Sequence, residues 1–216
     1  MSTTRHHRTT AGKENADIDA EPLIPVWLLD VDGVVNASQP GWSAAPHRAR
    51  VWSPTDRYEY VLRWAPALVD RIRTLHLARA VEVRWCTTWC PDADQLERLW
   101  RFPPLGRALT ECPVPKSEYN WPLKLDAARQ VLASGRRLIW TDDEAIPVDG
   151  PERDKLIGAG RSLLIAPSSR RGLQPDDLAV IGAFLFGAFT QSPQSQHPGA
   201  VDRLPNRCSE DDRSEA

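Results

Sequence analysis

The sequence predicts an α/β fold, with a central, mostly parallel β-sheet that carries helices on both faces. Two observations support this prediction. Short apolar runs alternate with longer amphipathic segments through the middle of the chain, and turn residues separate them. The 216 residues are also enough to bury a core without the help of disulfides.

Apolar runs mark the predicted strands. The first run is bounded by Pro25 and Gly33, as expected for a short buried strand. The predicted strands cover residues 26–31, 81–86, 137–141 and 163–166, with a weaker candidate at 108–112.

Helices are predicted between these strands from their capping residues. Pro66 and Pro175 suit the first turns of two helices. Asp92 and Gln95 form the pattern of a capping box at the start of another helix. A further helix precedes the 137–141 strand and should end at Gly135.

The two ends of the chain are predicted to be disordered tails. Residues 1–21 and 191–216 are rich in polar, charged and proline residues, and such segments bury too little apolar surface to offset their ordering entropy. The folded domain is therefore expected over residues 22–190.

Composition argues for a cytoplasmic protein. The N-terminus has no apolar signal segment, and the longest apolar stretch, at 178–189, is too short to span a bilayer. The four cysteines form no CxxC pair, so we expect reduced thiols rather than a zinc site. A formal net charge of −2 does not indicate a polybasic nucleic-acid binder.

Two pairs of acidic residues directly follow predicted strands. Asp30 and Asp32 come at the end of the first strand, before a glycine turn, and Asp142 and Asp143 follow the third. In parallel sheets, ligands bind beyond the carboxyl ends of the strands. Paired carboxylates there suit a hard metal ion, a nucleophile with its acid/base, or both.

A hydroxyl and a lysine lie between the two acid pairs in the sequence. Thr87 or its neighbour Thr88 ends the second strand, where a hydroxyl can bind a phosphoryl oxygen. Lys124 opens the helix before the third strand, and Lys116 competes with it in the same connection. The spacing alone leaves both choices open.

This order of acid pair, hydroxyl, lysine and acid pair resembles the four motifs of the haloacid dehalogenase superfamily. The resemblance covers about residues 24–190, and its specific parts are the DVDGVVN block at 30–36 and the Asp-Asp block at 142–143. It implies a three-layer, Rossmann-like fold and a phosphatase that works through an aspartyl-phosphate.

The resemblance also implies roles for single residues. Asp30 would be the nucleophile and Asp32 the general acid and base. Thr87 would bind the phosphoryl group, and Lys124 would screen the charge of nucleophile and phosphate.

The implied cofactor is Mg²⁺. Asp142 would bind the ion together with Asp30 and the backbone carbonyl of Asp32. Asp143 would be a second ligand, direct or through water, or an orienting group.

The sequence differs from common members of the superfamily in the segment after the first motif, where a large cap domain can be inserted. Residues 37–65 are too few for a large cap domain, and we expect a small β-hairpin flap with tryptophans and arginines. An open site of this kind suits a large phosphorylated substrate, such as a nucleic-acid end. The Trp85–Trp89 and Ile139–Glu144 blocks are also similar to a bacterial subgroup associated with RNA-repair proteins, although most of the nine tryptophans are expected to pack in the core.

Two other functions stay open at this point. One is phosphoryl transfer between substrates on the same scaffold. The other is a binding or regulatory module with little turnover, although the acid at Asp32 argues against it. The sequence does not indicate the substrate or the oligomeric state.

Overall fold

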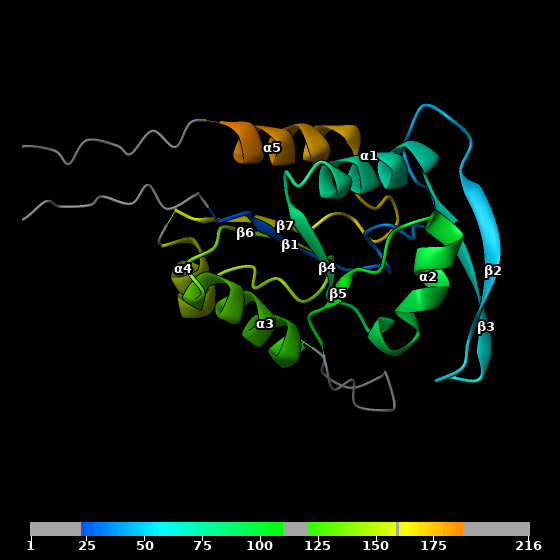
Figure 1. Cartoon of the computed structure of the whole chain (residues 1–216), viewed down its shortest axis with the longest axis horizontal. Coiled ribbons are helices and arrows are strands. Elements are labelled where there is room, and N and C mark those ends of the chain that lie inside the picture. The colour runs from blue at the N-terminus through cyan, green and yellow to red at the C-terminus, as the bar shows by residue number, and fades with distance from the viewer. Residues whose placement is uncertain (1–22, 110–120, 159, 188–216) are drawn as a thin grey trace, which may run out of the picture.

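A five-stranded parallel sheet forms the centre of the protein (Figure 1). The computed structural model describes residues 23–109, 121–158 and 160–187. The predicted tails, 1–21 and 191–216, lie outside these residues. The sheet has the order β5-β4-β1-β6-β7, and all four pairings are parallel. Its strands are β1 (Val26–Leu29), β4 (Glu82–Trp85), β5 (Gly106–Arg107), β6 (Leu138–Thr141) and β7 (Ser162–Ile165).

The chain winds outward from β1 in both directions. It first builds β4 and β5 on one side, then returns to place β6 and β7 on the other. The order therefore reverses between β1 and β6, and such a switch point leaves a crevice at the carboxyl ends of the two strands. This α/β fold with a parallel central sheet confirms the fold class predicted from the sequence.

Helices cover both faces of the sheet. Figure 1 shows α1 and α5 on one face and α3 and α4 on the other. The helices are α1 (Pro66–Leu77), α2 (Ala93–Trp100), α3 (Trp121–Ala133), α4 (Gly150–Ile157) and α5 (Pro175–Phe186), with a 3₁₀ turn, η1, at Cys90–Asp92. Within the described residues, none of these helices is long and apolar enough to cross a membrane.

The predicted hairpin is present. Strands β2 (His47–Ser53) and β3 (Tyr58–Trp64) pair antiparallel and form a separate two-stranded sheet beside α2. Val51, Leu62 and Trp64 are buried on its inner face, which attaches the hairpin to the body of the protein.

Tryptophans account for much of the core. Trp27, Trp85 and Trp140 are fully buried on three neighbouring strands, and six of the nine tryptophans are buried in total. The indole N–H of Trp27 donates to the Thr141 hydroxyl at 2.9 Å, which satisfies both groups in the interior. Most tryptophans therefore pack in the core, as the sequence predicted.

Three local predictions were wrong or incomplete. The weak strand expected at 108–112 is absent at 108–109, and residues 110–112 lie outside the described part of the chain. The edge strand there is the two-residue β5, at Gly106–Arg107. Helix α2 begins where expected, but Asp92 does not cap it. Its carboxylate instead accepts hydrogen bonds from the hydroxyls of Ser53 and Thr55 in the hairpin. Helix α4 was not predicted.

Candidate active site

The register of the sheet brings two of the predicted acidic residues together. Leu29, the last residue of β1, pairs with Thr141, the last residue of β6. The next residues, Asp30 and Asp142, therefore leave neighbouring strands side by side, and the Asp30 N–H donates to the Thr141 carbonyl at 3.1 Å. Both carboxylates lie at the switch point of the sheet.

Lys124 joins these two carboxylates. It lies in the first turn of α3, and its Nζ is 2.8 Å from Asp30 Oδ2 and 2.7 Å from Asp142 Oδ2. All three side chains are buried. A buried charge is tolerated when it is paired and hydrogen-bonded, and this triad meets both conditions. The alternative, Lys116, lies outside the described residues.

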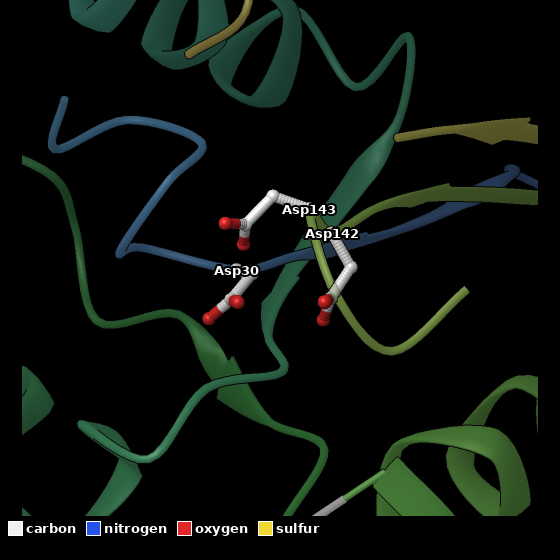
Figure 2. Close-up of side chains that lie close together, drawn as sticks. All are labelled: Asp30, Asp142 and Asp143. Atoms are coloured by element: carbon white, nitrogen blue, oxygen red, sulfur yellow. The ribbon is translucent and has the colours of Figure 1, made fainter. Parts of the chain in front are cut away.

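Asp143 completes a group of three carboxylates. One oxygen from each of Asp30, Asp142 and Asp143 lies within 4.8 Å of the other two, and such a group could hold a metal ion. Figure 2 shows Asp30 at the end of β1 and the other two at the end of β6, arranged around one small region.

Gly33 makes room for Asp143. Its φ of +73° lies in the left-handed region that favours glycine. A Cβ atom at this position would lie 2.0 Å from Asp143 Oδ2, which is far inside van der Waals contact. The glycine after the first acid pair is therefore needed for both the turn and the approach of the second acid pair.

Burial and mutual repulsion set the electrostatics of the carboxylates. Burial raises the pKa of Asp30 to about 7, although Lys124 lowers it, and the neighbouring Asp142 adds to the rise. Burial also raises the pKa of Asp143 to about 6. Burial alone would lower the pKa of Lys124, but Asp30 and Asp142 together raise it above its ordinary value. The site thus carries more negative charge than one ammonium group can offset.

Backbone N–H groups fix Asp142 from its other side. Its Oδ1 accepts hydrogen bonds from the N–H groups of Glu144 at 3.1 Å and Ala145 at 2.7 Å. With Lys124 on Oδ2, the carboxylate has partners at both oxygens. Asp142 is therefore held in one orientation before any ligand binds.

Asp32 does not belong to this group of three carboxylates. Its side chain is exposed, and the Asn36 amide donates to its Oδ1 at 2.7 Å. The indole N–H of Trp89 donates to its Oδ2 at 2.9 Å. The predicted role of the Asp32 carbonyl as a metal ligand stays a prediction.

Thr87 lies beside β1 at the same edge of the sheet. It follows the end of β4 by two residues, and the Cys86 N–H still pairs with the Leu29 carbonyl. Thr87 is buried, whereas Thr88 is half-buried. The Thr87 hydroxyl accepts a hydrogen bond from the backbone N–H of Trp89 at 3.4 Å.

No family model, curated protein or solved structure matches this chain. Asp30 is a buried carboxylate beside a fixed ammonium group, at a sheet edge where ligands bind. Such a group can act as a nucleophile toward an electrophile whose negative charge Lys124 would stabilise.

Two residues at the site were not assigned a role from the sequence. Asn36 belongs to the DVDGVVN block, and its fixed place after the acid pair was the only available signal. The sequence offered no signal for Trp89, because a tryptophan near a strand end is more often part of the core. Their shared contact with Asp32 is visible only in three dimensions.

Proposed function

We propose that this protein is a Mg²⁺-dependent phosphatase of the haloacid dehalogenase type, with Asp30 as its nucleophile. The observation that carries the proposal is the triad in which Lys124 bonds both Asp30 and Asp142 at the switch point of the sheet. These residues come from segments far apart in the sequence. Their order along the chain is the one that the family resemblance implies.

The proposed reaction has two steps. Asp30 attacks phosphorus, the bond to the leaving oxygen breaks, and that oxygen takes a proton from Asp32. This step yields an alcohol and an aspartyl-phosphate. Water then attacks the phosphorus of this intermediate and gives its proton to Asp32, while the bond to Asp30 breaks. Inorganic phosphate leaves, and both aspartates return to their starting forms.

Lys124 and Thr87 support this reaction in different ways. The ammonium of Lys124 lowers the pKa of Asp30, which burial raises, and so favours the ionised form that a nucleophile needs. The same charge would stabilise a phosphoryl group that carries negative oxygens. We assign the phosphoryl-binding hydroxyl to Thr87, which is buried at the adjacent strand end.

The donor set fits Mg²⁺. Asp30, Asp142 and Asp143 offer only oxygen atoms, which hard cations prefer. Three ionised carboxylates against one ammonium leave a formal charge of −2, which a divalent cation would neutralise. When bound, Mg²⁺ would reduce the repulsion between the Asp30 carboxylate and the phosphate. We propose the Asp32 carbonyl as the fourth protein ligand.

We propose a large phosphorylated substrate, such as a nucleic-acid end. A small hairpin stands in place of a cap domain. Its outer face exposes Arg48, which pairs directly with Arg63 across the strands, and Trp52. Like charges placed opposite each other on a sheet are unfavourable, and a bound anion would relieve them.

The experiment is a phosphate-release assay with p-nitrophenyl phosphate and 5′- and 3′-phosphorylated oligonucleotides, with and without Mg²⁺. Asp30→Asn should abolish release. Asp70→Asn is the matched control, because Asp70 is exposed on α1 and its carboxylate pairs with Arg73 on the same helix. Calorimetry of Mg²⁺ binding gives a readout independent of turnover.

Each outcome of this experiment has a clear meaning. Release that requires Mg²⁺ and Asp30 supports the proposal, and the preferred oligonucleotide then identifies the substrate class. Phosphate transfer to an added alcohol in place of water would indicate a phosphotransferase. Mg²⁺ binding without release from any substrate would favour a binding module and contradict the proposal.

A further inference from the structure

The Asp32 carboxylate is held firmly although it is exposed. Exposed aspartates usually rotate freely in water, but here each oxygen accepts a hydrogen bond from a side chain, at 2.7 Å from Asn36 and at 2.9 Å from Trp89. A carboxylate oxygen has two lone-pair sites. Each oxygen therefore keeps one site for a reacting proton.

Both side chains that hold Asp32 are in turn attached to strand β3 of the hairpin. The side-chain amide oxygen (Oδ1) of Asn36 accepts a hydrogen bond from the backbone N–H of Arg63 at 2.8 Å. The Trp89 ring packs edge-to-face against Tyr60, with centroids 5.1 Å apart and planes at 67°. Arg63 and Tyr60 both belong to β3, so one strand supports both contacts to the acid.

The other end of the hairpin is fixed to the Trp89 segment through Asp92. This buried carboxylate accepts hydrogen bonds from the hydroxyls of Ser53 at 2.5 Å and Thr55 at 2.9 Å. Asp92 lies in the 3₁₀ turn that directly follows Trp89. The Tyr60 hydroxyl also donates to Asp56 at 3.0 Å, within the hairpin turn. The hairpin and the Trp89 segment therefore form one cross-linked unit.

We infer that the hairpin is a positioning device for Asp32, and that Trp89 and Asn36 are the positioning residues through which it acts. The inference rests on the proposed function, in which Asp32 transfers the proton. Proton transfer requires a donor at hydrogen-bond reach and in a defined direction, and a fixed orientation avoids the entropy cost of finding it. The hairpin supplies this orientation from outside the sheet.

This role predicts a specific kinetic signature. A leaving group that is a strong base needs a proton as it departs, whereas a weakly basic one departs without much help. Phenyl phosphate and p-nitrophenyl phosphate have nearly the same shape but differ in this respect. A misplaced Asp32 should therefore lower kcat/KM more for phenyl phosphate than for p-nitrophenyl phosphate.

The test compares kcat/KM for both substrates in Trp89→Phe, Asn36→Ala and a control. Trp100→Phe is the matched control, because the Trp100 indole N–H has no hydrogen-bond partner within the described part of the chain, and the ring is also buried among aromatics. Trp89→Phe removes the N–H but keeps a ring against Tyr60. Asn36→Ala breaks the second contact by another route, in case the first variant does not fold.

We expect Trp89→Phe and Asn36→Ala each to lower kcat/KM by about tenfold for phenyl phosphate and by about twofold for p-nitrophenyl phosphate. Trp100→Phe should change kcat/KM by the same factor for both substrates. Equal losses for both substrates in both folded variants would overturn the positioning role while leaving the phosphatase proposal intact. Absence of release by the wild type from either substrate would instead overturn the phosphatase proposal, and this inference with it.

Discussion

Replacing Lys124 with methionine tests the electrostatic centre of the site. Methionine is similar in length but cannot donate a hydrogen bond or carry charge. The change removes the ammonium group that donates to Asp30 Oδ2 at 2.8 Å and to Asp142 Oδ2 at 2.7 Å. Asp142 is fully buried and Asp30 is 6% exposed, so little water reaches the two carboxylates in place of the ammonium group.

The expected loss of stability follows from this burial. Removing one partner of a buried ion pair costs about 3–5 kcal/mol, because the remaining charge is left uncompensated. The loss should be largest near pH 8, where Asp30 is ionised in the wild type, since its pKa is about 7. Near pH 5 Asp30 is protonated in both proteins, so less of the stabilisation from Lys124 is present to be lost.

The assay is urea unfolding of the metal-free protein near pH 8 and near pH 5. Lys155→Met is the control, because Lys155 is 69% exposed at its side chain and pairs with Glu152 at the surface. Such a pair contributes about 0–1 kcal/mol. If Lys124→Met and Lys155→Met lose the same small amount at both pH values, the buried triad does not exist as described.

Three further predictions concern the turn, the metal and the hairpin. Gly33→Ala should weaken Mg²⁺ binding by about tenfold or more in calorimetry, because its Cβ would displace the Asp143 carboxylate. Gly135→Ala should leave binding unchanged, since it has a similar φ of +80° but its nearest neighbour lies at 4.0 Å. Mg²⁺ affinity should fall as the pH is lowered from about 8 to about 5.5. Asp30 and Asp143, with pKa values of about 7 and about 6, take up protons over this range, and the ion must displace them. An affinity that does not change with pH would contradict the proposed ligands. Asp92→Ala should lower the free energy of unfolding by about 1–3 kcal/mol in urea, because it removes the buried acceptor of two hairpin hydroxyls, and an unchanged midpoint would show that the hairpin is attached in another way.

The sequence predicted the parts of the fold that are governed by strong local patterns. The β1 and β6 strands are short, fully buried apolar runs, and the acidic residues directly after them mark where they end. Because parallel strands end at the same edge, the meeting of Asp30 and Asp142 could be expected without coordinates. The hairpin was expected because the insertion is too short for a cap domain and carries tryptophans and arginines.

Other features depend on contacts that no local pattern encodes. Asp92 has the spacing of a capping box, yet two hairpin hydroxyls, far away in the sequence, compete successfully for its carboxylate. Strand β5 pairs over only two residues, so it leaves no periodic signal. Helix α4 begins at Gly150 and Pro151, which in sequence alone resemble a loop.

Within the site, too, some features follow from the sequence and others depend on contacts between distant residues. Lys124 is a candidate from the motif order, but only its two short contacts show that it meets both acids. Asp143 lies near Asp30 because Gly33 has no side chain, and this steric condition is set by the packing of two distant turns. The hydrogen bond from Trp89 to Asp32 could not have been predicted from the sequence. An indole N–H can donate to any nearby acceptor, and the sequence does not show which acceptor is near.

The most direct test of the central claim is to trap the phosphorylated enzyme. The protein would be mixed with Mg²⁺ and acetyl phosphate, quenched in acid and reduced with borohydride, which converts an aspartyl-phosphate to homoserine that mass spectrometry can locate. The proposal predicts homoserine at residue 30 only, dependent on Mg²⁺, absent in Asp30→Asn and accumulating in Asp32→Asn, because hydrolysis then lacks its base. Phosphate release by a wild-type protein that is never modified at Asp30 would contradict the assignment of the nucleophile.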